Sequence, residues 1–298
     1  MTTNIWSDSE ILKFYENVIC FDKNERELQA CDFFCVAARK KYMTAEQRET
    51  INLGDTCMMQ KTLIKDYDSV DFLNKLKQID ATLDYLLDRD NKYIPRSCMV
   101  IYTNINHVDM FKSMRHFRYL LADRSYELSS LMRDYNESKK RNLINQIKSA
   151  NNQIKSVQNY LLKTFQDPKN GIKNWFDIDC DIDEEADYLE RTTQIDRLST
   201  LKKLLEKTLN TTIPPYVIKT RGGCHVLVNN KSIKEHNSNL AKTYAGKELG
   251  EKAMSAPKIL DIVSNFFKDA KTKEIKINQN AGVPTPGTIQ GEFKVRMY

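Results

Sequence analysis

An aspartate occupies every second position in the stretch WFDIDCDID, which runs from Trp175 to Asp183. Alternation with apolar residues predicts a β-strand that carries its carboxylates on one face. The acidic residues after Ile182 suit the N-terminus of a helix whose other end is basic, and Asp181 suits the turn before that helix. Asp177 and Asp179 lie in mid-strand, where helix capping does not explain them.

Two carboxylates about 7 Å apart on one face of a strand repel unless a cation lies between them. Mg²⁺ or Mn²⁺ prefers hard oxygen ligands, and two such ions can hold the oxygens of a phosphoryl transfer. We therefore expect Asp177 and Asp179 to bind divalent metal. The alternative is an exposed edge strand whose acidic face is simply solvated.

A second motif, VIKTRGGCHVLV, spans Val217–Val228 and places a basic turn with two glycines between two apolar runs. The glycines let the backbone approach a ligand and present N–H groups to an anion, and the residues before them add charge and a hydroxyl suited to phosphate. His225 opens the second run, where it could meet a phosphate or pair with a carboxylate, or be incidental to a hairpin. The candidate nucleotide-binding residues are Lys219, Thr220, Arg221, Gly222, Gly223 and His225.

WFDIDCDI followed by IKTRGGCHVLV resembles the first two motifs of the archaeo-eukaryotic primase superfamily. CMVIYTNINHVDMFKSMRHF is similar to the strand and helix that begin this core in primase-like proteins of phages and mobile elements. The resemblance covers residues 96–298 and implies a primase–polymerase-type core with an RNA-recognition-like antiparallel sheet. It implies that Asp177 and Asp179 bind the catalytic metals and that His225 contacts the phosphates of the incoming nucleotide.

The third motif of the family, an acidic residue on a later strand, is not clear. The matching strand KEIKINQN has Asn278 at the equivalent position. Glu274, Glu292 and Asp261 are acidic alternatives that spacing does not separate. Loss of one carboxylate weakens a second metal site, so a catalytically weak or inactive DNA-binding accessory protein is the alternative to an active enzyme.

The expected reaction is template-directed primer synthesis for DNA replication, a nucleotidyl transfer from nucleoside triphosphates with Asp177, Asp179 and His225 as catalytic residues. Positive charge around the triphosphate speeds phosphoryl transfer. A metal-dependent nuclease shares the carboxylates but does not need the basic turn. The sequence has no nucleoside-triphosphatase phosphate loop, so a replicative helicase would be a separate partner.

Basic residues are the expected contacts to a single-stranded DNA template, since Lys and Arg neutralise phosphates. One group lies on the polar side of a helix expected over 137–165, although a solvated helix face is the alternative. A second lies on the strand that ends the stretch VPTPGTIQGEFKV, whose loop is either a structural turn or part of a template groove. AARKKY near residue 40 is a third basic patch, with aromatic residues for stacking close by. The template-binding candidates are Lys139, Lys140, Arg141, Lys148, Lys294 and Arg296.

These motifs require an α+β fold with a helical N-terminal region over 1–95 and a primase-like core over 96–298. The first region is expected to hold helices over 7–19, 27–43 and 69–87. In the second, 98–105 is a buried strand followed by a helix, 184–209 and 256–268 are helices, and strands cover 214–220, 224–228 and 273–278.

The 298 residues have a net charge of +6, which permits a nucleic-acid partner without requiring one. The seven cysteines include no CxxC pair, which favours reduced thiols, and Cys20, Cys31, Cys35 and Cys57 match no common zinc spacing. Apolar runs are too short for a membrane span, and no secretory signal is visible. We therefore expect a cytoplasmic protein, in the host cytoplasm if a phage encodes it.

Overall fold

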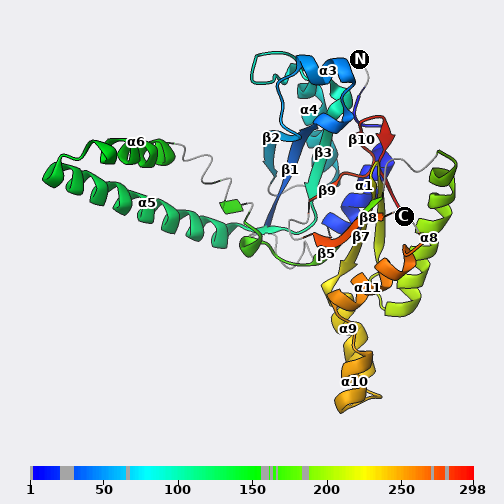
Figure 1. The fold of residues 1–298 in the computed structure, drawn as a ribbon. Helices are drawn as coiled ribbons and strands as arrows, with labels where there is room; N and C mark the ends of the chain where they lie inside the picture. Colours follow the sequence, from blue (N-terminus) through cyan, green and yellow to red (C-terminus); the bar gives the residue numbers. More distant parts are fainter. Residues whose placement is uncertain are drawn as a thin grey trace. The chain divides into compact units, whose positions relative to one another are not determined.

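The computed structural model describes residues 3–20, 30–64, 68–155, 161, 164–165, 167–182, 188–269, 272–278 and 282–298. The fold is α+β with antiparallel sheets, as expected (Figure 1). The chain divides into two compact units. Unit 1 comprises Met1–Glu25, Asp32–Asn106 and Lys173–Tyr298, and unit 2 comprises Arg26–Cys31 and His107–Ile172. Residues on both sides of the predicted boundary at residue 95 thus belong to unit 1.

The first sheet of unit 1 has the strand order β2-β1-β3-β9, with every neighbouring pair antiparallel. This sheet shares one hydrophobic core with the second sheet of unit 1. Helices α1 and α4 contribute buried residues to that core, among them Phe14, Phe72 and Leu76. Short helical segments connect these elements. The bounds are β1 (Ala30–Arg39), β2 (Thr56–Ile64), β3 (Met99–Asn104), β9 (Gly282–Pro284), α1 (Asp8–Phe14), a π-helical turn (Tyr15–Ile19), α3 (Ala45–Thr50) and α4 (Ser69–Thr82).

The helix expected over 27–43 is wrong, because the described residues from Ala30 to Arg39 form β1. Almost every residue from Cys31 to Ala38 is buried, since β1 lies between β2 and β3. A strand buried on both faces does not alternate apolar and polar residues. A short apolar run of this kind cannot be distinguished from a buried helix by its hydrophobic periodicity. The region 1–95 is therefore not purely helical: it supplies β1 and β2.

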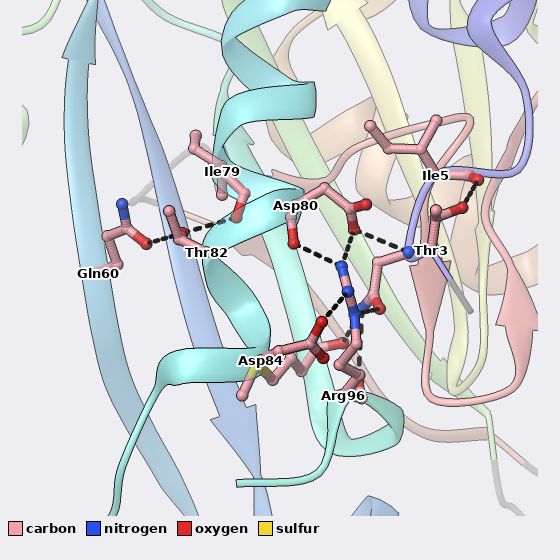
Figure 2. A network of polar contacts seen from close by, with 10 residues as sticks. Thr3, Ile5, Gln60, Ile79, Asp80, Thr82, Asp84 and Arg96 are labelled. Carbon is pink, nitrogen blue, oxygen red and sulfur yellow. Dashed lines mark hydrogen bonds and ion pairs between the residues drawn. The ribbon is translucent and has the colours of Figure 1, made fainter. Parts of the chain in front are cut away.

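An ion-pair network joins the N-terminal segment to α4 and to the approach to β3 (Figure 2). The Arg96 guanidinium donates to Asp80 Oδ1 at 2.7 Å and to Asp84 Oδ2 at 2.8 Å. The backbone N–H of Asn4 donates to the same Asp80 oxygen at 2.8 Å. The Arg96 and Asp80 side chains are only 13% and 9% exposed, so each depends on the other for compensation of its buried charge.

The second sheet of unit 1 has the order β12-β6-β7-β5-β8 and is also antiparallel between neighbours. Helix α8 connects β5 to β6, and α9, α10 and α11 connect β7 to β8, which makes a β-α-β-β-α-β connection. The strands predicted at 214–220, 224–228 and 273–278 and the helix predicted at 256–268 are confirmed. The bounds are β5 (Trp175–Ile182), α8 (Tyr188–Leu209), β6 (Tyr216–Thr220), β7 (Gly223–Asn229), α9 (Asn230–Ala241), α10 (Gly246–Lys252), α11 (Ala256–Phe266), β8 (Thr272–Asn278) and β12 (Arg296–Met297).

The two faces of this sheet are buried differently. One face packs Ile178 and Val226 against Leu201 of α8 and Val263 of α11 in a core of its own. The other face contributes residues such as Leu227 to the core that the first sheet shares. Figure 1 shows α8 and α11 beside the strands of this sheet. Alternate residues of β5 therefore face either the helices or the first sheet.

Residues 282–298 run along both sheets. In this segment β9 pairs with β3 and β12 pairs with β6, and between them β10 (Ile289–Gln290) and β11 (Phe293–Lys294) form a hairpin. Thr285 donates its Oγ1 hydroxyl to the Ile101 carbonyl at 3.0 Å, and Thr288 is fully buried. The loop predicted at 283–295 is therefore an ordered connection between the sheets.

Unit 2 contains a helical hairpin, in which α5 (Met110–Ser138) is followed by α6 (Arg141–Lys155). The helix expected over 137–165 does not begin at 137: α5 continues to Ser138, and Lys139 adopts a left-handed conformation with φ 53° that ends it. Turning back lets the apolar residues of α6 pack on α5. A short strand, β4 (Val108–Asp109), pairs with Ala30 and Cys31 in the same unit.

Candidate functional site

The register of the second sheet collects the predicted acidic residues on one face. Asp179 lies directly opposite His225 on β7, and Asp177 lies opposite Asn278 on β8. Asp181 lies opposite Gly223 and Glu274. Directly paired residues of antiparallel strands share a face, so three aspartates, a histidine and an asparagine are grouped together. This is the face turned away from α8 and α11.

Asp177 is fully buried and its carboxylate is already hydrogen-bonded. His225 Nδ1 lies 2.9 Å from Asp177 Oδ2 and 3.1 Å from Oδ1. Asn278 donates its Nδ2 amide to Oδ2 at 2.8 Å. A buried carboxylate needs such partners, because an unpaired charge in the interior is strongly destabilising.

His225 lies between two carboxylates. Its Nε2 is 3.8 Å from Asp179 Oδ1, on the side opposite the bond to Asp177. Burial lowers the pKa of His225, but the charge and hydrogen bond of Asp177, with a further contribution from Asp179, outweigh burial and raise that pKa to about 9. The ring is therefore an imidazolium at neutral pH. This positive charge offsets the repulsion between the Asp177 and Asp179 carboxylates, so a metal ion is not the sole group that can do so.

Asp179 is the more accessible partner, with its side chain 25% exposed. Burial raises the pKa of Asp179, the neighbouring imidazolium of His225 opposes that rise, and the charges of Asp181 and Asp177 add to it. Lys276, directly opposite on β8, also favours the charged form. Asp179 is thus the carboxylate of this pair that can reach a ligand without breaking the buried hydrogen bonds of Asp177.

Two residues of the first sheet, Arg39 and Tyr102, complete the electrostatics of the site. Arg39, at the end of β1, donates from Nη1 to the Tyr102 hydroxyl at 2.9 Å. Burial raises the pKa of Tyr102, Arg39 opposes that rise, and the nearby charges of Asp179 and Asp181 add to it. The acidic face therefore faces Tyr102 and Arg39. Arg39 belongs to the basic patch AARKKY, but Tyr102 carried no signal beyond its place in an apolar strand.

The basic turn after β6 lies beside this face. The Arg221 backbone N–H donates to Gln290 Oε1 at 2.8 Å, and its guanidinium lies 4.5 Å from the centre of the Tyr42 ring. At Gly222 an added Cβ would lie 3.8 Å from both Asp181 Oδ1 and Lys41 Nζ. The turn is therefore bordered by an aspartate on one side and by a lysine of AARKKY on the other.

Other predicted nucleotide-binding residues are placed less favourably. Lys219 pairs with Cys224, so it alternates to the opposite face from His225, and it is buried with Nζ 5.6 Å from the centre of the Phe293 ring. Thr220 pairs with Gly223, which lies opposite Asp181, so Thr220 shares the acidic face, although it is buried. Of the predicted residues from Lys219 to Gly223, Lys219 is the one that points away from the acidic face.

The predicted template-binding residues are divided between the two units. Lys294 and Arg296 are exposed and flank Trp6, with their charged groups 5.4 and 5.3 Å from the ring centre. The other four belong to unit 2, where the first two are in the turn after α5 and the last two are on α6. All four are exposed: Lys139, Lys140, Arg141 and Lys148.

The candidates for a third acidic residue lie at different places in the structure. Asn278, the position matched by resemblance, contacts Asp177 directly. Glu274 lies opposite Asp181 and forms an ion pair with Lys276. Asp261 lies on α11, which packs on the opposite face of the sheet, and Glu292 lies in the turn between β10 and β11.

No preformed metal cluster is present in the described ranges: they contain no group of three or more His, Cys, Asp or Glu side chains able to hold a metal ion. This covers Cys20, Cys31, Cys35 and Cys57, none of which forms a disulfide bond. Within the same ranges, no helix is long and apolar enough to cross a bilayer. No family model, curated protein or solved structure matches this chain.

Proposed function

We propose that this chain is a primase-polymerase, a metal-dependent nucleotidyltransferase that extends primers on single-stranded DNA for replication. The observation that carries the proposal is that Asp177, Asp179 and His225 share one face of a β-α-β-β-α-β sheet, next to a basic glycine turn. In this proposal the second sheet is the RNA-recognition-like half of a primase–polymerase-type core. The protein acts in the cytoplasm with a separate helicase.

The donor chemistry of the acidic face suits Mg²⁺ or Mn²⁺. Such ions are commonly bound by one or two carboxylates and completed by substrate phosphates, so a preformed cluster of three protein ligands is not required. Asp179 is partly exposed, and Asp177 becomes available when His225 Nδ1 is displaced. When bound, the metal would neutralise the triphosphate and lower the pKa of the attacking hydroxyl.

The chain's own residues bind and orient the triphosphate in this proposal. The His225 imidazolium and the guanidinium of Arg221 supply positive charge near the phosphates, where fixed charge stabilises the transition state. Lys41 extends this positive edge across Gly222. The Arg39–Tyr102 pair of the first sheet lies opposite the acidic face. The hydrogen bond from Arg39 fixes the direction of the Tyr102 hydroxyl.

A second candidate is a DNA-binding replication protein of the same fold without synthesis. Two observations favour it: Asn278 occupies the place of a third acid, and both Asp177 oxygens are engaged by His225 and Asn278. An amide cannot replace a carboxylate as a charged metal ligand.

A primer-extension assay separates the candidates. Purified protein is given Mn²⁺ or Mg²⁺, a single-stranded template and labelled ribo- or deoxyribonucleoside triphosphates. We expect wild type to make products and Asp179→Asn to lose at least about 100-fold in rate, the scale of losing one transition-state contact in a preorganised site. Glu49→Gln, an exposed carboxylate on α3, serves as the matched control and should keep the wild-type rate. Template binding without products from wild type under any condition would select the second candidate, and equal rates for Asp179→Asn and wild type would refute the first.

A further inference from the structure

Helix α5 of unit 2 has two contrasting faces. Seven residues spaced three or four apart along it are buried or half-buried: Ser113, Phe117, Leu120, Arg124, Leu128, Leu131 and Tyr135. On the opposite side five residues at spacings of four, four, seven and seven are exposed, and we call them the outer stripe: Phe111, Arg115, Tyr119, Tyr126 and Arg133. These spacings keep the five side chains on one side of the helix.

The three aromatic rings of the outer stripe are far more exposed than a folding role explains. Phe111 is 65% exposed, Tyr119 58% and Tyr126 75%. Aromatic side chains gain most from burial, and a row of them on a helix surface is typical of an interaction site. The row follows the helix for about 23 Å from Phe111 to Tyr126, at 1.5 Å per residue.

The charge of the outer stripe is positive. Arg115 lies 5.7 Å from the centre of the Tyr119 ring, so a guanidinium and an aromatic face are presented together. Arg133 continues the stripe by two further helical turns, and Lys112 and Arg118 lie at its edges. By spacing, Asp123 lies at one edge of the stripe, whereas Glu127 lies toward the other side of the helix, where it pairs with Arg124.

We infer that the outer stripe binds single-stranded nucleic acid, with unpaired bases stacked on Phe111, Tyr119 and Tyr126 and phosphates held by Arg115 and Arg133. Stacking on aromatic side chains within a basic surface is the general way of binding single strands without sequence preference. A lipid surface is less favoured, because the stripe is interrupted by Ala122 and Ser129 and lacks a broad aliphatic face. The inference goes beyond the proposed nucleotidyl transfer and does not depend on it, because no residue of the acidic face takes part.

The test measures binding of a fluorescein-labelled oligodeoxythymidine by anisotropy, using the full chain. Tyr119→Ala/Tyr126→Ala should raise Kd by about 25-fold, since each lost stacking contact costs about five-fold or more. Alanine is the best helix former, so α5 should remain folded. Tyr119→Phe/Tyr126→Phe keeps the rings and should bind as wild type does. The matched control is Tyr85→Ala/Tyr93→Ala, which removes two equally exposed tyrosines of unit 1 and should leave Kd unchanged.

Two further measurements separate stacking from simple charge attraction. An abasic strand of the same length should bind wild type at least as weakly as the oligonucleotide binds the double alanine variant, which keeps the Phe111 ring. Arg115→Gln/Arg133→Gln should reduce the slope of log Kd against log salt by about 1.4, at about 0.7 for each phosphate contact on a single strand. Asp179→Asn should bind as tightly as wild type, which keeps this test distinct from the primer-extension assay.

The inference is overturned if the double alanine variant binds within two-fold of wild type, or if wild type binds the abasic strand equally well. It is also overturned if wild type fails to bind the oligonucleotide at low salt. Loss of self-association in the double alanine variant, with unchanged affinity for the oligonucleotide, would instead assign the stripe to a second copy of the chain and refute a nucleic-acid partner.

Discussion

The bond between His225 and Asp177 predicts a specific dependence of stability on pH. His225 has an ordinary pKa of 6.5, and the Asp177 carboxylate raises that pKa in the folded protein to about 9. A raised folded-state pKa means that the folded protein binds this proton more tightly than the unfolded chain does. The resulting stabilisation is fully present below pH 6.5 and is lost as the pH rises through 9.

The size of the effect follows from the shift. One pKa unit corresponds to about 1.4 kcal/mol, so a rise from 6.5 to about 9 is worth about 3 kcal/mol. Solvent screening reduces this little, because the His225 side chain is only 10% exposed and that of Asp177 is fully buried. The free energy of unfolding should therefore fall by about 3 kcal/mol from this site between pH 6 and pH 9.5.

Urea unfolding of wild type and His225→Gln at several pH values isolates this contribution. Groups remote from His225 titrate equally in both proteins, so their effects cancel in the difference. The variant should be less stable than wild type at pH 6, and this difference should shrink by about 3 kcal/mol by pH 9.5. His236→Gln, which changes a histidine on α9 outside the acidic face, is the matched control for a histidine substitution as such.

A constant difference between wild type and His225→Gln, within about 1 kcal/mol from pH 6 to pH 9.5, would refute the reasoning. It would mean that His225 is neutral in the folded protein and that the Asp177–His225 contact is an uncharged hydrogen bond. Titration of the imidazole carbon resonance by NMR would then give an ordinary or lowered pKa for His225 instead of a raised one.

Two further changes test the packing of unit 1. Asp80→Ala leaves the buried Arg96 guanidinium with Asp84 as its one remaining carboxylate partner in the network and should lower the free energy of unfolding by about 3 kcal/mol, measured by urea unfolding; a loss below about 1 kcal/mol would contradict the network. Gly291→Ala should cost about 1–3 kcal/mol, because φ is +68°, a left-handed conformation that strains a residue with a Cβ; the nearest atom, Arg221 Nη1, is the end of a flexible side chain and can move away. Gly222→Ala, where the nearest atoms are 3.8 Å away, is its control and should be nearly neutral; equal losses at both glycines would contradict the predicted backbone strain.

The second sheet was the most predictable part of the fold. Strand β5 shows the alternation of a strand with one apolar face, and the β6–β7 hairpin is marked by two glycines between apolar runs. These signals are local, so the sequence alone reveals them. The shared face of Asp177, Asp179 and His225 follows from the pairing of β5 with β7, and the sequence anticipated that His225 could pair with a carboxylate.

In the first sheet, β3 matches the buried strand predicted over 98–105, but β1 and the contact of Arg39 and Tyr102 with the acidic face could not be predicted for a physical reason. Strand β1 is buried on both sides and has no period of two, so its residues appear equally suited to a helix. Arg39 and Tyr102 meet the acidic face only through packing between sheets, and residue types do not encode such distant contacts. The end of α5 at Lys139 was likewise hidden, since no glycine marks its left-handed residue.

Residues 282–298 give each sheet one of its strands, which constrains how the protein can be made. Until the ribosome has delivered this segment, the edge of β3 has no β9 and the edge of β6 has no β12. An incomplete nascent chain would thus expose two unpaired strand edges at once, which invite association with other chains. We expect folding to be slow and dependent on chaperones, because partners as distant as Tyr102 and Pro284 must meet before the core can close.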